Sequence, residues 1–143
     1  MTDEAVLLVE TGTPIPFRLS AATAIPKGTH MKLINPFMCS ISAGSADQVA
    51  GIAASEKIAG DGILILPVFD EGYFRVKASG AISVGDPLAT ANQAVGENVV
   101  YSVVATTLDV SGTAIIGEAM EGVADGATLV MKLNPHSVMD PRV

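Results

Sequence analysis

Ile-Pro-Lys-Gly-Thr-His-Met at residues 25–31 is echoed by Ile-Ser-Val-Gly-Asp-Pro-Leu at residues 82–88. Two further stretches recur in the same order. Val-Ala-Gly-Ile-Ala at 49–53 returns as Ile-Ile-Gly-Glu-Ala at 115–119, and the Gly-Asp turn at 59–62 returns as Asp-Gly at 124–127 before a second apolar run. Such self-similarity is typical of a duplicated unit that cannot bury its apolar face alone. We therefore expect two similar β units that close on each other.

Between these repeated motifs the sequence consists of short apolar runs separated by turn residues. Turn signals fall about every 8–12 residues, which is the rhythm of an all-β protein. Residues 73–78 alternate between two faces, the period of a half-buried strand, and no window shows the apolar stripe of a helix. The sequence predicts an all-β fold, a small barrel or sandwich of about seven to nine short strands. A helical turn at 55–59 is the expected exception.

Glycines set the expected turns. Because glycine accepts positive φ without steric cost, we predict turns at Gly28, Gly62, Gly85 and Gly126. A further turn at residues 70–72 is expected to join the strands on either side of it as a hairpin.

Prolines mark the ends of the expected domain. Pro14 and Pro16 remove two backbone donors and argue against a central strand there, and Asn134-Pro135 is expected to end the last strand. We therefore predict an N-terminal arm at residues 1–16, a single β-barrel domain at 17–134 and a C-terminal tail at 135–143.

The composition is unusually apolar for a chain of this size. Of the 143 residues, 49% are hydrophobic and 16% are charged, and the mean hydropathy is +0.47. No run approaches the roughly 18–20 apolar residues that cross a bilayer, so no membrane partner is expected. This excess of apolar residues favours contacts between subunits of a homo-oligomer. The alternative is that abundant small Ala and Val side chains raise the hydropathy without forming an interface.

The charges argue against a nucleic-acid surface. The net charge is −7, the eight Lys and Arg residues are scattered, and Trp is absent, whereas phosphate binding needs clustered cations. The single cysteine, Cys39, permits no intrachain disulfide, and the acidic start at residues 1–4 does not resemble a secretion signal. We expect the chain to be synthesised in a cytoplasm.

Residues suited to catalysis or metal binding are few. His30 and His136 are far apart, and no His-x-x-x-His or Cys-x-x-Cys spacing occurs. Cys39 lies in an apolar segment, where a free cysteine behaves as a small hydrophobe. We interpret the acidic pairs at 70–71 and at 118 and 121 as turn and strand residues, because acid–base catalysis needs carboxyl groups that converge on one cleft. The sequence predicts no enzyme, no metal and no cofactor.

Several of these motifs resemble the small β-barrel head decoration (capsid cement) proteins of tailed bacteriophages. The resemblance spans about residues 20–134. It implies a structural virion protein without catalytic or cofactor residues, synthesised in the host cytoplasm and bound to the capsid exterior. It also implies a homotrimer that stabilises the shell by bridging subunits of the major capsid protein. The motifs that carry it lie at residues 25–33, 49–58, 74–88, 116–121 and 128–133.

The apolar run near the N-terminus is the predicted contact with a partner. Leu7, Leu8 and Val9 would be costly to leave in water, and an arm of this kind can add a strand to a neighbour's sheet. Alternatively, the run is the first strand of the barrel itself. Two other functions remain open: a β-barrel module that binds a glycan or another small ligand, and an enzyme with a cleft formed only by the fold.

Overall fold

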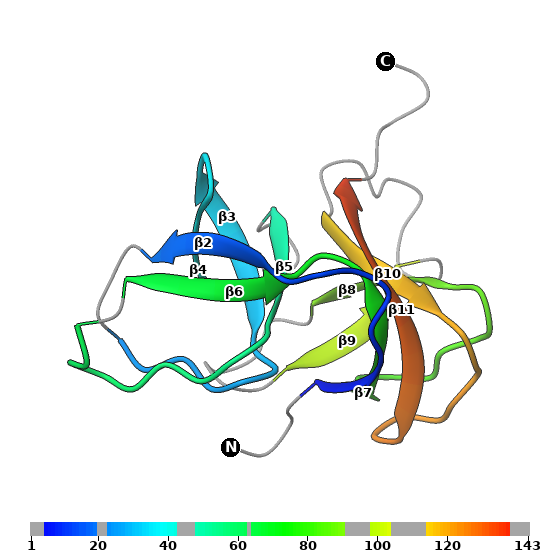
Figure 1. Ribbon diagram of the computed structural model, residues 1–143. Coiled ribbons are helices and arrows are strands. Elements are labelled where there is room, and N and C mark those ends of the chain that lie inside the picture. The colour runs from blue at the N-terminus through cyan, green and yellow to red at the C-terminus, as the bar shows by residue number, and fades with distance from the viewer. Residues whose placement is uncertain are drawn as a thin grey trace.

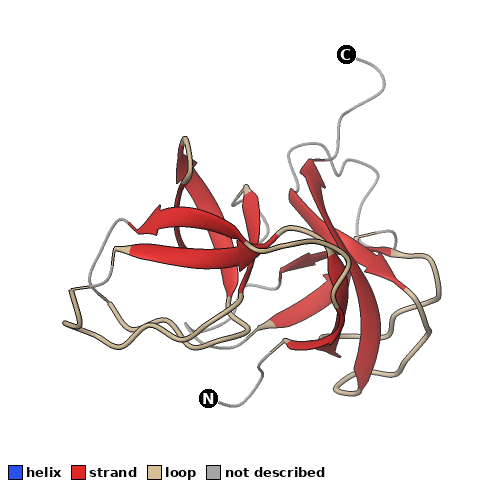
Figure 2. Ribbon diagram, viewed as in Figure 1, coloured by secondary structure: helices blue, strands red, loops and turns tan. Residues whose placement is uncertain are grey.

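The computed structural model describes residues 5–19, 23–42, 48–62, 64–90, 98–103 and 114–137. Within these ranges the chain forms eleven β-strands and no helix (Figures 1 and 2). The expectation of an all-β fold is confirmed. The strands are β1 (Val6–Val9), β2 (Ile15–Leu19), β3 (His30–Asn35), β4 (Met38–Ile41), β5 (Val49–Ala53), β6 (Ile65–Phe69), β7 (Gly72–Ala78), β8 (Pro87–Thr90), β9 (Val99–Ser102), β10 (Ala114–Ala119) and β11 (Thr128–Ser137).

The strands close into two barrels that lie side by side (Figure 1). The first barrel has the strand order β2-β4-β3-β5-β6. The second has the order β7-β11-β10-β8-β9 and closes through pairing of β7 with β9, while β1 lies beside β7. We expected a single small barrel or sandwich of about seven to nine strands. The chain forms two smaller barrels instead, because each repeat supplies enough strands to close on itself.

The two barrels have the same topology. In each, the first and third strands in chain order form a parallel pair, β2 with β4 and β7 with β9, and the other pairs of the ring are antiparallel. Strand by strand, β2 to β6 therefore correspond to β7 to β11. The expected duplication of a β unit is confirmed.

The correspondence extends to individual backbone hydrogen bonds. The turn that precedes β3 is fastened to the end of β5 by the same bonds that fasten the turn before β8 to the end of β10. The matched bonds are Gly28 N–H to Ala53 O (2.9 Å) with Gly85 N–H to Ala119 O (2.8 Å), Ala53 N–H to Thr29 O (2.9 Å) with Ala119 N–H to Asp86 O (2.9 Å), and the bridges Ile25–Lys57 and Ile82–Val123.

The expected hairpin around residues 70–72 is wrong. β6 ends at Phe69 in the first barrel and β7 begins at Gly72 in the second, so the turn connects the barrels instead of pairing its two strands. The sequence pattern was misleading because a turn between two strands has the same residues whether or not the strands pair. Gly72 has a φ of 135°, and a Cβ there would lie 3.1 Å from the carbonyl oxygen of Val9.

Both proline expectations also need correction. Pro16 lies within β2, opposite Pro67 of β6, and β2 pairs on both sides. The missing donor is tolerated because β4 joins β2 only from Arg18 onward. Pro135 lies within β11, which continues to Ser137, at a β-bulge where the register shifts between Ile115 and Gly117. A bulge is one of the places where a strand accepts proline.

The expected helical turn at 55–59 is wrong as well. Lys57 exchanges two backbone hydrogen bonds with Ile25, of 2.9 and 2.8 Å, and so forms a β-bridge. Pairing with a distant segment satisfies the peptide groups that a helical turn would otherwise have bonded locally.

The apolar core joins the two barrels. One buried cluster combines Val49, Ile52 and Phe69 of the first barrel with the interior of the second, including Phe74. The rings of Phe69 and Phe74 meet edge to face with centroids 5.7 Å apart. A separate cluster around Phe17, Met31 and Leu66 fills the first barrel. β5 is buried at every residue, because one face lines its own barrel and the other packs against the second.

Candidate partner-binding surfaces

The groups best suited to catalysis are buried and neutral. His30 is buried between the barrels, and burial lowers its pKa to about 4. Cys39 is part of the core of the first barrel, and burial raises the pKa of its thiol to about 11. The backbone of His136 lies in β11. Neither His30 nor Cys39 is therefore in a state that suits acid–base or nucleophilic chemistry near neutral pH.

The carboxylates mainly fasten turns and strand ends. Asp86 accepts hydrogen bonds from the Ser83 N–H and the Ser102 hydroxyl, both at 2.9 Å. Glu118 accepts one from the Asn134 amide at 3.2 Å. In the part of the chain that the structure describes, no three His, Cys, Asp or Glu side chains gather as metal ligands.

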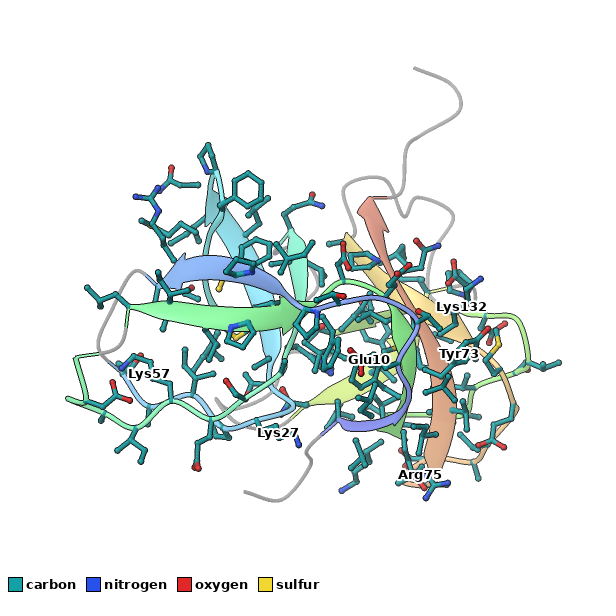
Figure 3. All side chains as sticks on the ribbon, in the orientation of Figure 1. Glu10, Lys27, Lys57, Tyr73, Arg75 and Lys132 are labelled. Carbon is teal, nitrogen blue, oxygen red and sulfur yellow. The ribbon has the colours of Figure 1, made fainter. Side chains whose placement is uncertain are left out.

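An ion pair made by a buried lysine was missed by sequence reasoning. Lys57 is almost fully buried in the first barrel, and its Nζ lies 2.9 Å from Oδ1 of Asp61 and donates to the Ile58 carbonyl at 3.3 Å (Figure 3). The corresponding position in the second barrel is Val123. The sequence did offer a signal, a lysine and an aspartate four residues apart with a turn glycine between them. The same spacing is equally common in turns whose side chains are all in water.

All four predicted turn glycines adopt positive φ: 83° at Gly28, 77° at Gly62, 85° at Gly85 and 82° at Gly126. The structure aligns the two repeats slightly differently from the sequence comparison, which matched residues 59–62 with 124–127. Gly60 (φ 76°) and Gly126 each follow their bridge residue, Lys57 or Val123, by three positions. The structural counterpart of Gly126 is therefore Gly60, not Gly62.

The predicted contact arm is a strand of this chain's own fold. β1 pairs with β7, and Leu7 packs partly buried against the core that joins the barrels. Leu8 and Val9 remain 40% and 53% exposed. The run is thus an added strand with an apolar outer face. A contact with a partner through Leu7, Leu8 and Val9 stays a prediction.

Other exposed apolar side chains gather at the turns. Among the described residues of the first barrel, one group lies at the tip of the β3–β4 hairpin, which projects from the body of the molecule (Figure 1). Another lies between β5 and β6 and at the start of β6. The sequence signal for the tip was a bulky residue directly after Asn-Pro. The first group is Leu33, Ile34 and Phe37; the second is Ile58, Leu64 and Ile65.

A polar depression of about 480 Å³ lies where the barrels join. Its walls come from three places in the chain: the segment after β1, the connection between the barrels, and the paired strands β7 and β11. Tyr73 and Lys132 are opposite each other in that pairing and lie close together on the second barrel (Figure 3). The lining residues are Thr11, Asp70, Glu71, Gly72, Tyr73, Lys132, Leu133 and Asn134.

Comparison with known proteins identifies the fold. No protein-family model matches the chain, and no curated protein matches it. The crystal structure of the N base of head fiber gp8.5 in bacteriophage phi29 is similar to this chain, with a TM-score of 0.54 and 18% sequence identity. The superposition covers 88% of this chain and 98% of that one. At this identity the likeness shows a shared fold.

No helix among the described residues is long and apolar enough to cross a membrane.

Proposed function

We propose that this chain is a structural protein of a phage head that attaches to the outside of the capsid. The observation that carries the proposal is the likeness of its two-barrel fold to a phage head fiber base, which it matches over 98% of that base. The resemblance of the sequence motifs to bacteriophage head decoration proteins agrees with the same role.

The distribution of side chains supports an adhesive function over a catalytic one. The described histidine and cysteine side chains are buried, and the described carboxylates at turns hold backbone groups in place. Exposed apolar side chains lie instead on β1, on the β3–β4 tip, between β5 and β6 and at the start of β6, with Val84 and Met120 on the second barrel. Such surface suits a protein that binds other proteins.

We further propose that the protein forms a homotrimer, which bridges subunits of the major capsid protein and so strengthens the shell. Many copies on one shell can each bind with modest affinity. Light scattering of the purified chain gives its mass, and sedimentation with purified, expanded heads gives its occupancy. We expect trimers that saturate the heads and raise the temperature at which the heads break. Heads that sediment without the protein would contradict the proposal.

Deletion of residues 2–13 tests the arm. It removes β1, and we expect the two barrels to remain folded while the occupancy on heads falls. Circular dichroism checks that the strands persist. Unchanged occupancy of a folded deletion variant would show that the arm makes no contact with the shell.

The depression at the barrel junction favours a second function, the binding of a glycan. Carboxylates, an amide and a lysine ammonium supply both acceptors and donors, and Tyr73 offers an aromatic face beside them. Binding to a glycan array by the wild-type chain, lost in Tyr73→Ala, would support this function. An array without signal would remove it.

A further inference from the structure

The turn between β3 and β4 holds a bulky residue in an unfavourable backbone conformation. Phe37 has a φ of 52°, and it is the one non-glycine residue among those described with positive φ. In this region the Cβ of an L-residue crowds the backbone, which is why glycine and asparagine are usual there. Strain of this kind persists only where surrounding contacts impose it, and it is frequent at sites of function.

Two contacts hold Phe37 in place. Its carbonyl accepts a hydrogen bond of 2.7 Å from the N–H of Arg18 on β2. Its ring lies 6.0 Å, centroid to centroid, from the ring of Phe17, which is buried in the first barrel. The Phe37 side chain nevertheless remains 64% exposed. The fold therefore presents an aromatic ring to the outside, with its backbone held by β2 and its ring beside that of Phe17.

The rest of the tip is also exposed, and most of it is apolar. All five residues from Leu33 to Phe37 are exposed, and Leu33 and Ile34 are each 39% exposed. Aromatic side chains are enriched in the cores of protein–protein contacts, so an exposed phenylalanine near two exposed aliphatic residues in the sequence suits such a contact.

The charged side chains on the three strands that carry the tip are positive. On β2, β3 and β4 the charged side chains are Arg18 and Lys32, and these three strands contain no carboxylate. Arg18 stands in register with Met38, the residue after Phe37. The whole chain has a net charge of −7. An acidic surface therefore repels most of the molecule and attracts the tip, which would orient the chain as it approaches.

We propose that the β3–β4 tip is the docking point on the shell. It inserts Phe37, flanked by Leu33 and Ile34, into an apolar hollow of the capsid exterior that is edged by carboxylates, which Arg18 faces. This inference rests on the proposed function and names the chemistry of the partner surface. It also accounts for Phe37, whose strain lowers the stability of the free protein and whose ring is used only in the complex.

The test compares stability with attachment. Phe37→Asn removes the ring and suits positive φ, and Phe37→Gly removes both ring and strain, so each variant is expected to melt at or above the wild-type temperature. Each should need at least about tenfold more protein to half-saturate purified heads. Val84→Asn is the matched control, because Val84 is a comparably exposed apolar residue in a turn of the second barrel; its attachment should match wild type. Arg18→Gln should weaken attachment about threefold and flatten its dependence on salt.

The possible outcomes separate the two proposals. If the wild-type chain does not bind heads, the proposed function fails, and this inference with it. If the wild type binds and both folded Phe37 variants bind equally well, only the docking point is wrong. If the variants change the mass in light scattering but not the occupancy, the tip contacts a second copy of the chain. If they lose binding to anionic phospholipid vesicles and keep binding to heads, the tip binds lipid. Either of the last two results overturns the inference.

Discussion

The hydroxyl of Thr90 on β8 lies 3.2 Å from Nδ1 of His30 on β3, and this contact joins the two barrels. The backbone N–H of His30 also donates to Oδ1 of Asn98, at 2.9 Å. Nε2 of His30 is buried and has no hydrogen-bond partner among the described residues. A protonated imidazole would have two N–H donors and a charge to satisfy in this site, so the ring is held neutral.

His30 is expected to make stability dependent on pH. Burial lowers its pKa from 6.5 to about 4, so between these values the unfolded chain binds a proton that the folded chain does not. Stability contributed by the neutral ring is complete above pH 6.5 and falls as the pH drops toward about 4. The loss reaches about 3 kcal/mol from this group alone.

Urea unfolding at pH 7 and at pH 4.5 measures this effect. His30→Gln keeps a polar side chain of similar reach and does not titrate, so its stability should change less between the two pH values. Acidic residues contribute to both proteins and cancel in the comparison. Equal changes in the wild type and in His30→Gln would show that His30 is not responsible.

The ion pair between the buried Lys57 and the partly exposed Asp61 gives a second prediction. Asp61→Ala leaves the ammonium of Lys57 buried without its carboxylate, which should cost about 2–4 kcal/mol, at the lower end if water enters through the partly exposed Asp61 site. Adding Lys57→Val copies the second barrel, which has Val123 at the matching position, and should restore most of the loss. Thermal melts of the single and double variants test this. A double variant as unstable as Asp61→Ala would refute it.

Two glycines allow the strands to approach closely. A Cβ at Gly51 would collide with the carbonyl oxygen of Phe69, and one at the equivalent Gly117 with that of Lys132. Alanine at either position should destabilise the protein by about 2–4 kcal/mol. Gly60→Ala is the control, because Gly60 has positive φ but open space around it, and should cost only about 1–2 kcal/mol. The free energy of unfolding should therefore be higher for Gly60→Ala than for Gly51→Ala or Gly117→Ala.

The two leucines of β1 should differ in their effect on stability. Leu7 packs against the shared core, and Leu8 is 40% exposed. Leu7→Ala is expected to cost about 1–2 kcal/mol, and Leu8→Ala about 0.5 kcal/mol or less. Chemical denaturation of both variants measures the difference. Equal losses would mean that β1 packs differently from its place beside β7.

The repeat could be predicted from the sequence alone because its turn residues are determined locally. A residue such as Gly28 or Gly85 is required by the backbone angles of its own turn, and the same turn recurs wherever the unit recurs. The alternation in residues 73–78 similarly reports one buried face of one strand. These local requirements determined the all-β class, the duplication and most strand positions.

The pairing of strands is not local, and only the tertiary structure decided it. Residues 70–72 have the composition of a hairpin turn, yet β6 and β7 close different barrels, because β6 pairs with the distant β2 and β7 with the distant β11. Lys57 is buried because a distant segment, Ile25, bridges to it, and Phe37 is exposed because Phe17 and Arg18 hold its turn. Turn chemistry acts between neighbours in sequence, whereas burial and exposure depend on which segments meet in space.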